Sequence, residues 1–153
     1  MTTSPMSISV TIRRATSTVV VFRGEELVST EVIDVGGDDV DAAITEHVRT
    51  SAGIEIGPRT AERIKIELGG AAQLSIKGRS LETGVPASCD VVVDEVQQAA
   101  LAAMEPVVGR LDGLLQRWGR KTSEVHLDGG GALLAGFAER VTYSAIMGRK
   151  GGD

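Results

Sequence analysis

Cysteine and aromatic residues are scarce in this 153-residue chain. The lone Cys89 has no partner for an internal disulfide, and the N-terminal residues lack the charged segment and apolar run of a secretory signal. Both features predict a reducing, cytoplasmic compartment. With one Trp, one Tyr and two Phe, the core must be built mainly from aliphatic side chains. No stretch approaches the roughly 20 apolar residues that span a bilayer, so a soluble protein is expected.

A basic surface is also lacking, because 16 Lys and Arg stand against 21 Asp and Glu, for a formal net charge of −5. This balance argues weakly against nucleic-acid partners, whose phosphates select a positively charged face. His47 and His126 stand alone, with no second His or Cys at metal-ligand spacing. The length, with 42% hydrophobic and 24% charged residues, fits one compact globular domain.

Residues 8–35 have the pattern of three adjacent antiparallel strands. The first alternates apolar and polar residues over 8–12, as in a strand with one buried face. The apolar run at 19–22 predicts the second strand, and the polar turn at 23–26 leads into the third.

Helices and shorter strands follow. Glycines at 36 and 37 end the meander, and apolar residues recur at helical spacing over 40–48, with Asp38 as a plausible N-cap. Gly57 and Pro58 open a second helix, which ends before the glycines at 69 and 70. Strands are expected near 74–76 and 89–93.

The clearest element is a long apolar stripe over 94–118, which predicts one helix kinked at Pro106. Val125 and Leu127 then mark a short strand, and three glycines turn the chain into a helix over 132–140.

The glycine turn is the sharpest physical signal for a ligand. Gly129, Gly130 and Gly131 follow a strand and precede a helix, an arrangement that lets a ligand approach converging backbone amides. A tight turn with no ligand has the same pattern. Asp128 favours that alternative, because a carboxylate repels phosphate.

Two pairs of charged residues, one on the second helix and one in the first turn, each have a functional and a non-functional interpretation. Glu62 and Lys65 lie three apart, so they form either a solvated pair or a nucleoside contact, with Glu62 accepting from ribose hydroxyls. Arg13 and Arg14 are either an anion patch or hydrated surface residues. Cys89 has no nucleophile context and is expected in the core.

Several segments, taken in order, resemble the MreB/Mbl family of bacterial actin-like, rod-shape-determining proteins. The similarity covers roughly residues 10–136. It is carried by residues 35–44, 57–69, 78–86, 100–106 and 127–134.

The resemblance implies an α/β fold, the second half of an actin-like (ribonuclease H-like) protein whose two lobes clasp ATP and a divalent ion. It implies a single second-lobe domain, with an inner part of antiparallel meander and helices (about 8–37 and 94–140) and a smaller outer α+β part (about 38–93). Glu62 and Lys65 match the family's adenosine-contacting helix. Gly129, Gly130 and Gly131 match the family's turn that lies under the nucleoside and phosphates of the bound nucleotide.

One departure concerns the second phosphate loop, where the family has an Asp, three glycines and two threonines. This chain reads Thr11-Ile12-Arg13-Arg14-Ala15-Thr16-Ser17. Thr11 replaces the Asp that organises the metal's water shell, and arginines replace glycines that wrap the phosphates. The first lobe is not represented in the chain, so meaningful ATPase activity is not expected, and Mg is expected only together with nucleotide.

The sequence therefore predicts a divergent, truncated MreB-like protein of the cell-shape cytoskeleton. Its expected capacities are weak or lost ATP binding and contact with full-length MreB-like subunits or with itself, for example by capping a filament. Nucleic-acid and direct membrane binding are not expected. The alternatives are a non-nucleotide interaction module or relic of such a gene, and, least favoured, an enzyme of the wider kinase and chaperone superfamily.

Overall fold

The computed structural model describes residues 6–68, 70–118 and 122–129, and all statements about the structure concern these residues. They form two compact units. The first unit comprises the described residues of Met1–Gly37 and Met104–Asp153, and the second is Asp38–Ala103. No helix in the described ranges is long and apolar enough to cross a bilayer.

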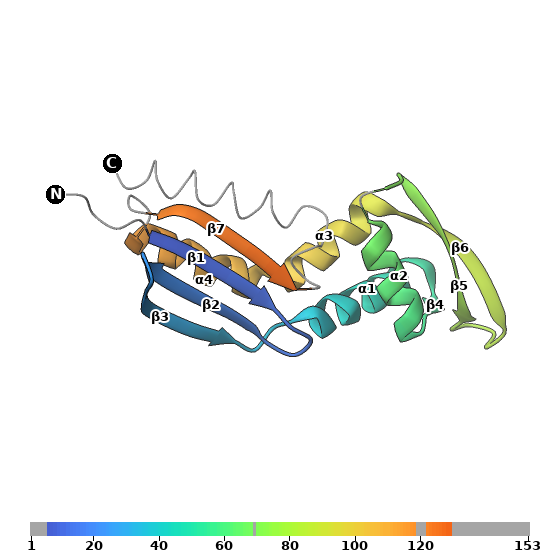
Figure 1. The fold of residues 1–153 in the computed structure, drawn as a ribbon. Coiled ribbons are helices and arrows are strands. Elements are labelled where there is room, and N and C mark those ends of the chain that lie inside the picture. The colour runs from blue at the N-terminus through green and yellow to red at the C-terminus, as the bar shows by residue number, and fades with distance from the viewer. Residues whose placement is uncertain (1–5, 69, 119–121, 130–153) are drawn as a thin grey trace. The chain divides into compact units, whose positions relative to one another are not determined.

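Seven strands and four helices follow one another in the described part of the chain (Figure 1). In order they are β1 (Met6–Ile12), β2 (Ser17–Arg23), β3 (Glu26–Ile33), α1 (Gly37–Ala52), β4 (Ile54–Glu55), α2 (Pro58–Glu67), β5 (Gln73–Ser80), β6 (Pro86–Val92), α3 (Val93–Ala103), α4 (Glu105–Trp118) and β7 (Thr122–Gly129).

The first unit contains a four-stranded sheet of order β3-β2-β1-β7 (Figure 1). The first three strands are antiparallel neighbours, which confirms the predicted meander, and β7 pairs with β1 in parallel. Parallel neighbours need a long crossover, and here α4 and the whole second unit lie between them in sequence. The strand predicted at Val125 and Leu127 is thus present.

One face of this sheet forms the core of the first unit. All four apolar side chains of β1 that alternate with its polar residues are buried, and the register places Ile8 opposite Val21 and Val10 opposite Val19. Helix α4 contributes a buried apolar stripe at helical spacing, as expected of a helix that packs on a sheet. The stripe consists of Val107, Val108, Leu111 and Leu114.

The prediction of one kinked helix over 94–118 is wrong, because the structure has two helices, α3 and α4. Met104 separates them, and its carbonyl accepts from the amides of Val107 (3.0 Å) and Val108 (3.0 Å). Proline disfavours helical geometry at the residue before it and is tolerated in a first turn, where its missing N–H has no helical partner. Pro106 therefore starts a new helix instead of bending an existing one.

The second unit contains a three-stranded antiparallel sheet of order β4-β5-β6. It confirms the predicted strands near 74–76 and 89–93, although Val93 begins α3. Helix α2 begins as expected, with Gly57 as N-cap and Pro58 in the first turn. Helix α1 begins at Gly37, so Asp38 lies in its first turn, where a carboxylate still favours the helix dipole, and is not the N-cap.

Helix α3 belongs to the second unit. The Val93 amide at its start donates to the carbonyl of Ala72 (2.9 Å). This boundary differs from the expected one, which assigned the chain from residue 94 onward to the inner part.

Candidate functional site

Two of the candidate site residues, Glu62 and Lys65, lie on α2. The helix buries Ala61 and Ile64, so Glu62 falls on its exposed side. The Lys65 side chain is only 14% exposed, and its Nζ lies 3.0 Å from Oδ1 of Asp41 on α1, whose side chain is 29% exposed. The ammonium group is therefore held in place and its charge is already balanced within the second unit.

Sequence reasoning missed this partner of Lys65. Asp41 lies 24 residues earlier in the chain, and nothing in the local periodicity of α1 marks its carboxylate as different from those of its neighbours. A ligand that contacts Lys65 must share the ammonium with Asp41 or displace it.

Arg63, between the two candidates, ties α2 to β5. Its Nη2 donates to the Ser75 carbonyl (3.0 Å), and its Nε lies 3.9 Å from Oε2 of Glu67. The bond to Ser75 holds α2 on the second sheet, whereas the contact with Glu67 lies within the helix.

The glycine turn begins in the first unit. Gly129 is the last residue of β7 and pairs with Ile12 at the end of β1. Gly130 and Gly131 lie outside the described residues, as does the helix predicted over 132–140. Because Glu62 and Lys65 belong to the second unit, their convergence with the glycines stays a prediction.

The turn between β1 and β2 is tightly held. The Arg13 amide donates to the Thr16 carbonyl (2.9 Å), and the Arg13 carbonyl accepts from the Gly37 amide (2.8 Å). Ser17, which is fully buried, donates from its Oγ to the Val35 carbonyl (2.6 Å). Its backbone is therefore locked against the segment that leads into α1.

Gly36 permits this close approach. A Cβ at this position would meet the carbonyl oxygens of Arg13 and Arg14, the latter at 2.6 Å. Backbone oxygens cannot turn away as a flexible side chain can, so this position requires glycine.

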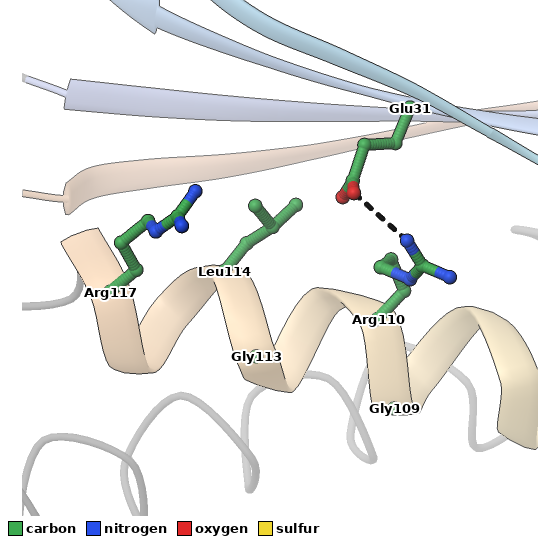
Figure 2. Close-up of a pocket in the computed structure, with 6 residues that line it drawn as sticks. All are labelled: Glu31, Gly109, Arg110, Gly113, Leu114 and Arg117. Carbon is green, nitrogen blue, oxygen red and sulfur yellow. Dashed lines mark hydrogen bonds and ion pairs between the residues drawn. The ribbon is translucent and has the colours of Figure 1, made fainter.

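The first unit also has a hollow of about 410 Å³ beside α4 (Figure 2). In Figure 2, Leu114 and Arg117 point from α4 toward the sheet, and Glu31 points from β3 toward the helix. Arg110 Nη1 lies 2.9 Å from Glu31 Oε1. The lining residues are Glu31, Gly109, Arg110, Gly113, Leu114 and Arg117.

Glu31 places a carboxylate on the core face of an edge strand. It pairs with Val19, whose side chain is fully buried, and its Oε2 is buried with no hydrogen-bond partner among the described residues. An inward charge on an edge strand opposes pairing with a foreign strand, because such pairing would bury it further. The hollow was not predicted, although Glu31 lies two residues before the buried Ile33 and so on the same strand face.

No catalytic constellation is present in the part of the chain that the structure describes. No group of three His, Cys, Asp or Glu side chains there is placed to hold a metal ion. Burial, followed by the nearby Asp90 carboxylate, raises the pKa of the half-buried Cys89. Its thiol therefore stays protonated at neutral pH and is a poor nucleophile.

Known proteins match this architecture. The family model for MreB/Mbl proteins matches residues 3–148. The chain belongs to the MreB/Mbl family. It is 32% identical over 140 residues to the cell shape-determining protein Mbl of Bacillus cereus, covering 84% of this chain and 42% of that protein. It is 32% identical over 143 residues to MreB of Escherichia coli K12, covering 84% of this chain and 40% of MreB.

Solved structures agree on the fold. Spiroplasma citri MreB5 bound to ADP superposes with a TM-score of 0.79 at 20% sequence identity, over 97% of this chain and 53% of that one. The AMPPNP-bound form of MreB5 superposes with a TM-score of 0.76. The expected actin-like α/β fold is thus confirmed. The chain spans 40 to 42% of the length of the MreB and Mbl relatives described here.

Replacing Gly36 with Ala is expected to destabilise the first unit. The added methyl group forces the Arg13 and Arg14 carbonyls to move, at a cost of about 2 kcal/mol in the free energy of unfolding. Urea denaturation measures this cost. Gly57→Ala is the control, since a Cβ there meets no described atom within 4 Å, and its cost should stay below about 1 kcal/mol, as expected when the N-cap glycine of α2 becomes alanine. Equal stability of the two variants would contradict the packing described for Gly36.

Removing the Arg110 side chain is expected to cost about 1 kcal/mol of unfolding free energy, because it leaves the half-buried Glu31 carboxylate without its ion pair. The double variant Arg110→Ala with Glu31→Leu should recover most of this loss, since Glu31 lies opposite the apolar Val19. Chemical denaturation of both variants tests the pair, with Arg117→Ala as control. A loss as large in Arg117→Ala would show that the pair is not the cause.

Proposed function

We propose that this chain is a divergent MreB-like protein of the bacterial cell-shape cytoskeleton that retains a weak adenosine-nucleotide half-site. The proposal rests on helix α2, whose sequence resembles the family's adenosine-contacting helix. This helix presents Glu62 on its exposed side, and its Lys65 is held in a fixed position by Asp41. An exposed carboxylate accepts from ribose hydroxyls, and a fixed ammonium beside it suits the sugar or base.

The proposed affinity is low for two reasons. Lys65 already pairs with Asp41, so nucleotide must compete with an internal contact. The turn after β1 uses the Arg13 amide for its own closure, so this amide is not available to phosphate. Gly129, Gly130 and Gly131 complete the proposed nucleotide contacts.

Hydrolysis is not part of the proposal. Thr11 stands where the family has the Asp that organises the metal's water shell, and a hydroxyl is a poor substitute for a carboxylate around Mg²⁺. Phosphoryl transfer depends on a positioned metal ion and phosphates, so the chain is proposed to bind ATP, with Mg²⁺ only as its counter-ion, and not to turn it over.

The proposed mode of action in the cytoplasm is association with full-length MreB-like subunits or with a second copy. The chain spans 40% of Escherichia coli MreB, so it offers part of the surface of a whole subunit. A head-to-tail contact propagates only when each subunit carries both complementary surfaces. A partial subunit that docks on a filament end would block further addition. Direct membrane and nucleic-acid binding are not proposed.

The alternative is an interaction module or gene relic that has kept the fold and lost nucleotide. The Lys65–Asp41 ion pair favours it, because that contact satisfies the lysine with no ligand present. Nucleotide titration separates the two proposals.

Titration of the full chain with a fluorescent ATP analogue is expected to saturate. Glu62→Ala and Lys65→Ala should each weaken binding about tenfold, because each removes a charge-assisted contact to the ligand. The control Glu82→Ala removes an exposed carboxylate elsewhere in the second unit and should bind like the unchanged chain. No saturation at millimolar analogue, or equal binding by Glu62→Ala, would favour the interaction module.

Light scattering of a polymerising full-length MreB tests the proposed association. Added substoichiometrically, the chain is expected to reduce assembly, since one blocked end stops the growth of many subunits. The heat-unfolded chain at the same concentration is the control. Normal assembly at equimolar chain would contradict the capping proposal.

A further inference from the structure

Helix α4 has an open side along the hollow between this helix and β3. Gly109 and Gly113 line the hollow, and a Cβ at either position, apart from its chain neighbours and the backbone of α4, would meet no described atom within 4 Å. Because neither residue has a side chain, the hollow extends to the backbone of the helix. Its volume of about 410 Å³ is in the range of pockets that hold small molecules.

Two arginines of α4 lie at the two ends of this hollow. Arg110 and Arg117 are seven residues apart, which is about two helical turns and roughly 10 Å along the axis, so they lie on one side of the helix. Leu114 lies between them, and Figure 2 shows Leu114 and Arg117 pointing from α4 toward the sheet. The hollow therefore has a positive charge near each end and an apolar residue in the middle.

Both guanidinium groups have N–H donors left for a ligand. Arg117 is exposed, and its side chain has no hydrogen bond or ion pair among the described residues. The Arg110 side chain uses Nη1 for the Glu31 carboxylate, at 2.9 Å, and is still 55% exposed. A guanidinium carries five N–H donors, so one contact leaves most of them available. Glu31 thus holds Arg110 at the wall of the hollow without saturating it.

The charges of the hollow favour an anion with two separate charged groups. The lining residues carry two guanidinium groups and one carboxylate, that of Glu31. A guanidinium fork matches the two oxygens of a carboxylate. Arg117 lies in the last turn of α4, where the negative end of the helix dipole disfavours a doubly charged phosphate more than a carboxylate. Two carboxylates joined by an aliphatic spacer over Leu114 therefore fit the hollow best.

We propose that the hollow between α4 and β3 binds a small aliphatic dicarboxylate, with one carboxylate on Arg110 and the other on Arg117. Glu31 is a positioning residue, because its contact with Arg110 orients that guanidinium. The site uses neither α2 nor the glycine turn, so it and the proposed nucleotide half-site can each fail alone.

Calorimetric titration of the full chain with succinate, glutarate and adipate tests the site, with the monocarboxylate butyrate and inorganic phosphate for comparison. At least one dicarboxylate is expected to saturate at millimolar concentration. It should bind about tenfold more tightly than butyrate, which leaves one arginine without a contact, and more tightly than phosphate. Salt should weaken binding as it screens the charges.

Variants of the lining residues locate the binding. Arg110→Gln and Arg117→Gln should each lower the affinity for that dicarboxylate about tenfold, to the level of butyrate. The control Arg49→Gln removes an arginine from the last turn of α1 and should bind like the unchanged chain. Gly113→Leu fills the hollow and should abolish binding. Its thermal midpoint should not fall, since leucine favours a helix more than glycine does, so lost binding would not reflect lost folding.

Glu31→Gln tests the positioning role. Its carboxamide oxygen still accepts from Arg110, whereas the negative charge beside the ligand is gone, so the affinity should rise about threefold. An affinity that does not rise overturns the placement of the ligand beside Glu31.

Three results would overturn the site as a whole. They are the absence of saturation by all three dicarboxylates, equal binding of butyrate and the best dicarboxylate, and unaltered binding by Arg117→Gln. Phosphate binding as tight as that of the best dicarboxylate overturns the dicarboxylate as the ligand.

Discussion

The parallel pairing of β1 with β7 is the interaction on which the first unit depends. β1 is an inner strand that buries four apolar side chains and hydrogen-bonds on both edges, to β2 by a short turn and to β7 across more than a hundred residues. Pairing β1 with β2 costs little loop-closure entropy, because the turn between them is short. Pairing β1 with β7 costs more, and the burial of the apolar core offsets this cost. That core is the aliphatic layer between β1, β2 and α4. Burial of this core is what stabilises the pairing of strands from the two ends of the chain.

The same pairing determines the chemistry at the edge of the sheet. Because the strands are parallel, the turn that follows β1 begins beside Gly129, the last residue of β7. Arg13 and Arg14 place two charged side chains in this turn, and both are exposed. Asp128, which pairs with Thr11, places a carboxylate one residue before Gly129. The long-range pairing of the two strands therefore decides which charged residues lie at this end of the sheet.

Two ion pairs have different consequences in this protein. Lys65 with Asp41 joins α2 to α1 inside the second unit, and the carboxylate balances the charge of the ammonium group. Arg110 with Glu31 lies under the edge strand of the first unit, where a buried carboxylate oxygen is costly to stability but discourages pairing with a foreign strand. The first pair balances the charge of Lys65 within the second unit, and the second opposes pairing of β3 with a foreign strand.

The sequence predicted the meander, the second helix and the strands of the second unit, because the spacing of apolar residues and the positions of glycine and proline are local signals. The family was predicted from the resemblance of several segments in order. The division of the 94–118 stripe into α3 and α4 was not readable, since the apolar spacing continues through the break and only backbone geometry around Met104 and Pro106 decides it. The partners of Lys65 and Glu31 were also beyond the sequence. An ion pair depends on which faces of two distant elements meet, and packing alone determines that. Sequence therefore determined the elements and the ancestry of this chain. Tertiary structure decided which charges are already paired and which turn lies beside Gly129, because both follow from long-range strand register and helix packing.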